Sequence, residues 1–196
     1  MRARQAGESA LLLLDAVDLL ERAGISYAVV GAMAAAVHGV VRASMDADAV
    51  IFLPAHRAAE LDRKCRAAGF MSEVRHGDPD DPIGAVLSLS DEFGNRVDLL
   101  LGLRGLGADA YARAAVIPFQ DGELRVVGRE DFIAMKLFAH GPQDLIDAEH
   151  ALLAMVLKRW RRWSACWRDR ISRGGSDYTD RAATAVGVAV NIKRYL

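Results

Sequence analysis

The segment from Asp46 to Leu53 restricts the fold of this chain more than any other. Two aspartates one residue apart, Asp46 and Asp48, open a run of strongly strand-forming residues. Because side chains alternate between the two faces of a strand, both carboxylates point to the same face. Two like charges on one face repel each other unless a positive group lies between them. The segment therefore predicts a strand that begins at a cation-binding end.

A third aspartate, Asp98, lies in a later apolar strand, Val97–Leu101. If the two strands are neighbours, three carboxylates meet at one place. Mg²⁺ prefers hard oxygen ligands from carboxylates and phosphates, and two metal ions about 3.5–4 Å apart can activate an attacking oxygen and stabilise a leaving pyrophosphate. The alternative is that Asp46 and Asp48 merely start a strand at its exposed mouth. We favour the metal site, because Asp98 and a glycine turn accompany the pair.

That glycine is Gly31, which follows the short apolar strand Tyr27–Val30 and precedes a helix. Backbone N–H groups at such a junction, including that of Ala32, can cradle phosphates with the help of the helix dipole. Arg42 and Ser44, just before the carboxylates, could contact phosphates or order the loop. The plainer interpretations are a tight turn at the glycine, a solvated arginine and a turn serine.

The order of the predicted elements indicates an α/β (α+β) fold: a mixed sheet flanked by helices, followed by a helical C-terminal part. We expect a core over residues 1–127, a helical region over 128–173, and a tail over 174–196 whose structure the sequence leaves open. The predicted helices are Ser9–Ala23, Ala32–Val37, Pro54–Ala68, Ala108–Ala115, Arg129–Ala139 and Asp144–Leu157. The predicted strands are Tyr27–Val30, Asp46–Leu53, Phe70–His76, Ile83–Ser90, Arg96–Leu101, Val116–Phe119 and Leu124–Val127.

Charge and composition narrow the function classes. The chain has 196 residues and a net charge of −1, so its overall charge does not predict nucleic-acid binding. Residues 151–175, however, carry seven basic residues and one acidic residue. Their three tryptophans at helical spacing could form an RNA-binding arm, although we prefer an amphipathic helix with a buried tryptophan stripe. The absence of a long apolar stretch and of paired cysteine motifs predicts a soluble, cytoplasmic protein without a membrane contact.

At these residues the sequence resembles a known group. Gly31-Ala32, Arg42-x-Ser44-x-Asp46-x-Asp48 and Asp98 between apolar residues resemble the DNA polymerase β-type nucleotidyltransferase superfamily. More narrowly, they resemble the AbiEii/AbiGii-type toxin group and its minimal nucleotidyltransferase relatives. The helix that carries Lys136 and the following Gln143-Asp144-x-x-Asp147 stretch are similar as well. The resemblance covers about residues 24–155.

The resemblance implies a role for each matching residue. Asp46 and Asp48 would bind Mg²⁺ or Mn²⁺, and Asp98 would complete the site or act as a base. Lys136 would contact the nucleotide phosphates, while Asp144 and Asp147 would shape the pocket or pair with it. The alternative for Lys136, weighed equally, is a helix lysine with a solvated ammonium group.

The resemblance thus implies a metal-dependent nucleotidyltransferase that uses a nucleoside triphosphate. Its acceptor would be tRNA or another RNA, and it would act as a toxin with an antitoxin partner. One alternative is a catalytically degenerate binding or regulatory protein, since Gly31-Ala32-Met33 stands where the group often has Gly-Gly or Gly-Ser, and the C-terminal tail is unusual. Another is an RNA-binding module that works through residues 158–170. The five histidines show no metal-binding spacing, and we expect each on the surface or in a loop, His38 being the least certain.

Overall fold

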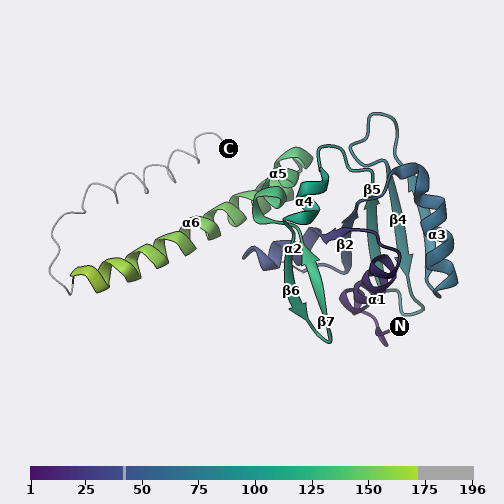
Figure 1. Ribbon diagram of the computed structural model, residues 1–196, viewed down its shortest axis with the longest axis horizontal. Helices are drawn as coiled ribbons and strands as arrows, with labels where there is room; N and C mark the ends of the chain where they lie inside the picture. Colours follow the sequence, from purple (N-terminus) through teal and green to yellow (C-terminus); the bar gives the residue numbers. More distant parts are fainter. Residues whose placement is uncertain (42, 172–196) are drawn as a thin grey trace.

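The computed structural model describes residues 1–41 and 43–171, without the side chains of 157–171. Its core is a seven-stranded mixed sheet in the order β3-β4-β5-β2-β1-β7-β6, flanked by helices as predicted (Figure 1). The strands are β1 Tyr27–Val29, β2 Asp46–Ile51, β3 Met71–His76, β4 Ala85–Ser90, β5 Arg96–Leu101, β6 Ala115–Phe119 and β7 Gly122–Val126. The helices are α1 Ser9–Arg22, α2 Gly31–Val37, α3 Ala58–Ala67 after a 3₁₀ turn at Ala55–Arg57, α4 Ala108–Ala112, α5 Arg129–Ala139 and α6 Pro142–Ile171.

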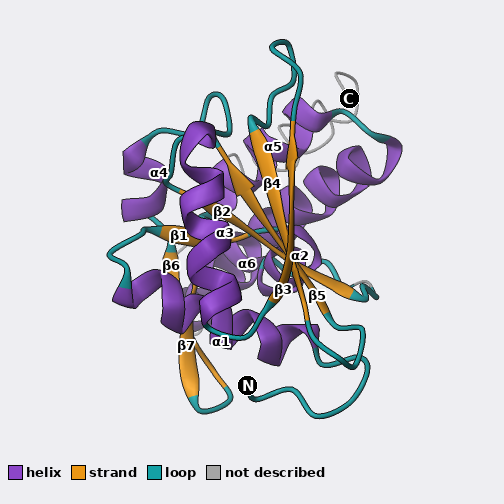
Figure 2. Cartoon of the chain, turned by 90° about the vertical axis from the view of Figure 1, so that its right-hand side faces the viewer, coloured by secondary structure: helices purple, strands orange, loops and turns teal. Residues whose placement is uncertain are grey.

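The two faces of the central sheet differ in burial. In β4 and β5 alternate residues such as Leu87 and Leu99 are fully buried, and α1 and α3 pack on that side (Figure 2). Between them along each strand lie partly exposed residues such as Ser88 and Asp98. This alternation is the period of two that a half-buried strand requires. The polar side chains of the sheet are thereby gathered on one face.

The pairing around β2 decides which residues meet. β2 runs antiparallel to β1 on one side and parallel to β5 on the other, and β4 and β5 form the predicted antiparallel hairpin across residues 91–95. The parallel pair requires a crossover, which runs through α3, β3 and β4. Consequently two segments about fifty positions apart in sequence become direct neighbours.

The C-terminal helices differ from the prediction in one respect. α5 ends at Ala139, the C-cap residue His140 has a left-handed φ of 56°, and Pro142 then opens α6. The predicted helix over 144–157 continues to Ile171, because the sequence offers neither glycine nor proline before residue 174. α6 extends away from the sheet (Figure 1). The side chains of the basic, tryptophan-rich stretch, and the tail over 174–196, lie outside what the structure describes.

His38 does not lie on the surface. It is 5% exposed at the C-terminal end of α2, its Nε2 lies 2.8 Å from the carbonyl oxygen of Val127, and its ring packs 5.2 Å from that of Phe132. His38 thus lies in a turn, as the prediction allows, but it is buried because the turn after α2 packs beneath the end of β7, which a sequence pattern does not reveal. The other four histidines are exposed. No helix among the described residues is long and apolar enough to cross a membrane.

Candidate active site

Two of the three predicted carboxylates are direct neighbours. Asp48 of β2 and Asp98 of β5 are register partners, and Ser88 of β4 is the next residue across the sheet. Register partners in adjacent strands present their side chains to the same face. Asp46 lies two residues earlier on that face, at the exposed start of β2. The structure therefore gathers Asp46, Asp48 and Asp98 on the open face of the sheet.

Arg96 occupies a place in this site that the sequence analysis did not foresee. Its Nε and Nη2 each lie 3.0 Å from an oxygen of Asp98, whose side chain is 18% exposed. The hydrogen bonds to Asp98 raise the pKa of Arg96. Arg96 is also the register partner of Asp46. The available signal was its position two residues before Asp98, which places it on the same strand face.

The three aspartates have the right ligand chemistry for a cation and share one face of the sheet, but their side chains do not form a closed cluster. Throughout the described chain, no three His, Cys, Asp or Glu side chains are grouped to hold a metal ion. Asp98 is engaged by Arg96, whereas Mg²⁺ needs only one or two protein carboxylates when phosphates supply the remaining ligands. Asp46 and Asp48 thus fit such an ion, and Asp98 would join them on leaving Arg96.

Gly31 is required by its contact with Asp48. Its φ of +60° is left-handed, and a Cβ atom built on it would lie 2.1 Å from Oδ2 of Asp48. The backbone N–H of Val30, just before it, donates a 2.9 Å hydrogen bond to the carbonyl oxygen of Asp48. Any other residue would force the carboxylate aside. The first turn of α2, which includes the buried Ala32, therefore begins directly against the candidate cation ligand.

Two serines order the strand ends that carry the acids. Ser44 donates a 3.0 Å hydrogen bond to the backbone carbonyl of Asp46, which agrees with the interpretation of Ser44 as a turn serine. Ser9, 6% exposed at the start of α1, was missed by sequence reasoning. Its hydroxyl donates to the carbonyl oxygen of Met45 at 2.6 Å and accepts from the N–H of Arg96 at 3.1 Å. It therefore connects β2 and β5 where the acids stand. Arg42 is not among the described residues.

Lys136 of α5 is enclosed by acids of α6. Its Nζ lies 2.7 Å from Asp144 and 3.1 Å from Asp147, and its side chain is only 13% exposed. Asp147 is fully buried and also accepts a 2.9 Å hydrogen bond from Gln143. A solvated ammonium group is thus the wrong interpretation. The two ion pairs hold α5 against α6 beside the candidate site.

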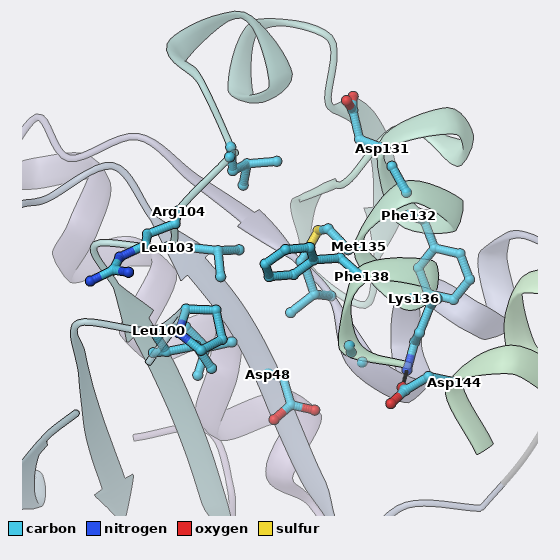
Figure 3. A pocket seen from close by; sticks show the side chains of 18 residues that line it. Asp48, Leu100, Leu103, Arg104, Asp131, Phe132, Met135, Lys136, Phe138 and Asp144 are labelled. Atoms are coloured by element: carbon cyan, nitrogen blue, oxygen red, sulfur yellow. Dashed lines mark hydrogen bonds and ion pairs between the residues drawn. The ribbon is translucent and has the colours of Figure 1, made fainter. Parts of the chain in front are cut away.

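A cavity of about 520 Å³ opens beside Asp48, the one of the three carboxylates that lines it. Figure 3 shows apolar side chains, among them Leu103, Met135 and Phe138, facing this hollow, with Asp48 at one end and the Lys136–Asp144 pair at another. Gly31 also lines it. A volume of this size suits a small organic ligand, for which roughly 300–1,000 Å³ is usual. The site therefore combines an acidic sheet face with an adjoining apolar chamber.

Comparison with solved structures identifies the fold. A protein from Thermotoga maritima assigned as a nucleotidyltransferase aligns with a TM-score of 0.53 at 15% identity, over 81% of this chain and 96% of that one. An antigenic nucleotidyltransferase-like protein from Paracoccidioides brasiliensis aligns with a TM-score of 0.50 at 13% identity, over 79% and 78%. No protein-family model and no curated protein matches the sequence. At these identities the likeness establishes a nucleotidyltransferase-like fold.

Proposed function

We propose that this protein transfers a nucleotidyl group from a nucleoside triphosphate to an acceptor hydroxyl, with Mg²⁺ or Mn²⁺ bound by Asp46 and Asp48. The nucleotidyltransferase-like fold supports this reaction class. The observation that carries the proposal is the register pairing of Asp48 with Asp98, which gathers the acids on one open face. A divalent cation held by Asp46 and Asp48 would neutralise triphosphate charge and favour departure of the pyrophosphate.

The residues of the chain have distinct tasks in this reaction. Backbone N–H groups at Gly31 and Ala32 would receive the phosphates, because the first turn of α2 begins beside Asp48. Asp98 would accept the proton of the acceptor hydroxyl once its two contacts with Arg96 open. The new bond joins the acceptor oxygen to the α-phosphorus, and the bond from that phosphorus to the bridging oxygen of pyrophosphate breaks.

The acceptor is proposed from the resemblance described above. The similarity to the AbiEii/AbiGii-type group favours tRNA or another RNA, and a toxin role countered by an antitoxin. The seven basic residues over 151–175 would supply contacts to the RNA backbone. The charge of Lys136 is compensated by Asp144 and Asp147, so we assign Lys136 to positioning α5 against α6.

Radiolabel transfer tests the reaction directly. The purified chain is incubated with each α-labelled nucleoside triphosphate, Mg²⁺ or Mn²⁺, and either tRNA or protein as acceptor. We expect label in the acceptor with wild type and with Asp80→Ala, a control in an exposed loop. The double variant Asp46→Ala/Asp48→Ala should show none. Equal transfer by wild type and the double variant under all four nucleotides would remove the proposal.

A second candidate is a regulatory protein that binds nucleotides without turning them over. Two observations favour it: Arg96 holds Asp98, and two acids hold Lys136. Each contact engages a group to which the resemblance assigns a role in catalysis or phosphate binding. Calorimetry with Mg²⁺ and each nucleotide, set beside the transfer assay, separates the two candidates, because binding without any transfer belongs only to the regulatory protein.

A further inference from the structure

We infer that the 520 Å³ cavity takes the nucleobase of the donor by apolar contact, so that the protein discriminates weakly among the four nucleotides. This inference rests on the proposed function and adds the class of donor that the site accepts. Two observations support the inference: the cavity has a mainly apolar lining, and the polar side chains of the lining already have partners within the protein.

The position of the cavity identifies which part of the donor enters it. Gly31 and Asp48 line one end, and these are the residues proposed to face the phosphates and the cation. A nucleoside joined to phosphates at that end must extend either over the open sheet face or into the cavity. The open face carries charged side chains such as Arg75 and Arg96. Because removing apolar surface from water is favourable, the flat faces of a base gain more by entering the apolar cavity than by lying on this charged face.

The wall of the cavity is built mainly from aliphatic and aromatic groups. Leu100 of β5, Leu103 and Leu106 after it, and Met135 and Phe138 of α5 supply most of it (Figure 3). Charged side chains of the wall have partners within the protein: Arg104 donates to the carbonyl oxygen of Pro79, Asp131 pairs with Arg113 at 2.8 Å, and Lys136 pairs with Asp144 at 2.7 Å. They are therefore poorly placed to read the hydrogen-bonding edge of a base.

The physical consequence is low selectivity. A site that hydrogen-bonds its substrate rejects an analogue lacking that group by about 10⁴–10⁵-fold, whereas apolar pockets separate ligands by only about 10–200-fold. Adenine and guanine present similar ring areas, so ATP and GTP should bind within roughly tenfold of each other. The smaller pyrimidines bury less area, and CTP and UTP should bind more weakly by about the same factor.

The test measures dissociation constants for the full chain with Mg²⁺ and ATP, GTP, CTP, UTP or tripolyphosphate. Phe138→Ala removes an apolar wall residue that is 66% exposed, so the variant should fold normally. It should weaken all four nucleotides by a similar factor and leave tripolyphosphate unchanged. Phe93→Ala, at an exposed phenylalanine in the β4–β5 turn, is the matched control and should change none of them.

The outcomes separate this inference from the function on which it rests. A preference above about 10³-fold for one purine nucleotide over the other would overturn the inference while leaving nucleotide binding intact. Undiminished nucleotide binding in Phe138→Ala would overturn the placement of the base. If neither tripolyphosphate nor any nucleotide binds in the presence of Mg²⁺ or Mn²⁺, the proposed function itself fails and the inference fails with it.

Discussion

Asp48 and Asp98 are register partners in the parallel ladder of β2 and β5, so their carboxylates lie side by side on one face of the sheet. Like charges directly opposite each other destabilise a sheet. Arg96 offsets this repulsion through its two contacts with Asp98. The negative charge on this face can therefore be neutralised either by Arg96 or by an added cation.

Replacing Arg96 should strengthen cation binding. In Arg96→Gln the carboxylate of Asp98 loses its compensating charge, so the three acids attract a divalent ion more strongly. Mn²⁺ titration followed by electron paramagnetic resonance should show a severalfold lower dissociation constant than wild type. Arg75→Gln is the matched control, because Arg75 also donates a hydrogen bond to Ser88, whereas Arg96 forms the ion pair with Asp98. Weaker Mn²⁺ binding by Arg96→Gln would mean that Arg96 supports the cation site instead of competing for it.

Gly31→Ala should abolish cation binding. The added Cβ would overlap Oδ2 of Asp48 at 2.1 Å and the left-handed φ would be strained, so the carboxylate must leave its position. Gly94→Ala is the control: it has a φ of +80° with open space around it, and it should bind Mn²⁺ like wild type while losing about 1 kcal/mol of stability. If Gly31→Ala retains normal Mn²⁺ affinity, Asp48 is not a ligand.

Ser9→Ala should weaken both the fold and the site. The carbonyl of Met45 and the N–H of Arg96 would lose a buried partner, which costs about 1–3 kcal/mol in the free energy of unfolding. Because these groups hold the starts of β2 and β5, Mn²⁺ affinity should fall as well, and Ser9→Thr should restore part of it. Ser72→Ala, whose hydroxyl pairs with Asp62 at the β3 edge, should leave Mn²⁺ affinity unchanged. Urea denaturation and Mn²⁺ titration of the three variants test this positioning role.

Lys136→Met should be the most destabilising of these substitutions. It leaves the fully buried Asp147 without its cation, and breaking a buried pair from one side costs about 3–5 kcal/mol. Lys64→Met removes an exposed pair with Glu60 and should change the urea midpoint little. A small loss in Lys136→Met would indicate that water reaches the acid, and Asp147→Asn in the same background should then bring no recovery of stability.

Stability should decline in alkaline solution. Burial raises the pKa of the Cys65 thiol to about 12 from 9.0 and that of the Tyr111 hydroxyl to about 12 from 10.0. The folded state therefore keeps protons that the unfolded state releases, so this contribution is complete below pH 9 and is lost between pH 9 and 12. Urea midpoints measured from pH 8 to pH 11 should fall, and more gently in Cys65→Ala/Tyr111→Phe. An identical pH profile in the double variant would refute the assignment.

Local patterns were sufficient for most of the fold. The alternation in Ala85–Ser90 and Arg96–Leu101, the turn between them and the glycines after helices predict elements that the structure contains, because these features depend on near neighbours in the chain. The same alternation placed Asp46 and Asp48 on one face. The exact helix ends and the burial of His38 were not predicted, since both depend on packing between distant segments.

The sequence by itself determined which acids share a strand face and which segments become strands and helices, because side-chain period and turn chemistry are local properties. Only the tertiary structure decided that Asp98 stands beside Asp48, that Lys136 already has acidic partners, and that Ser9 joins the two strands. These contacts bring together residues between 8 and 87 positions apart along the chain. They exist because the crossover between β2 and β5 and the α5–α6 turn bring separate segments into contact. No local propensity specifies which separate segments meet.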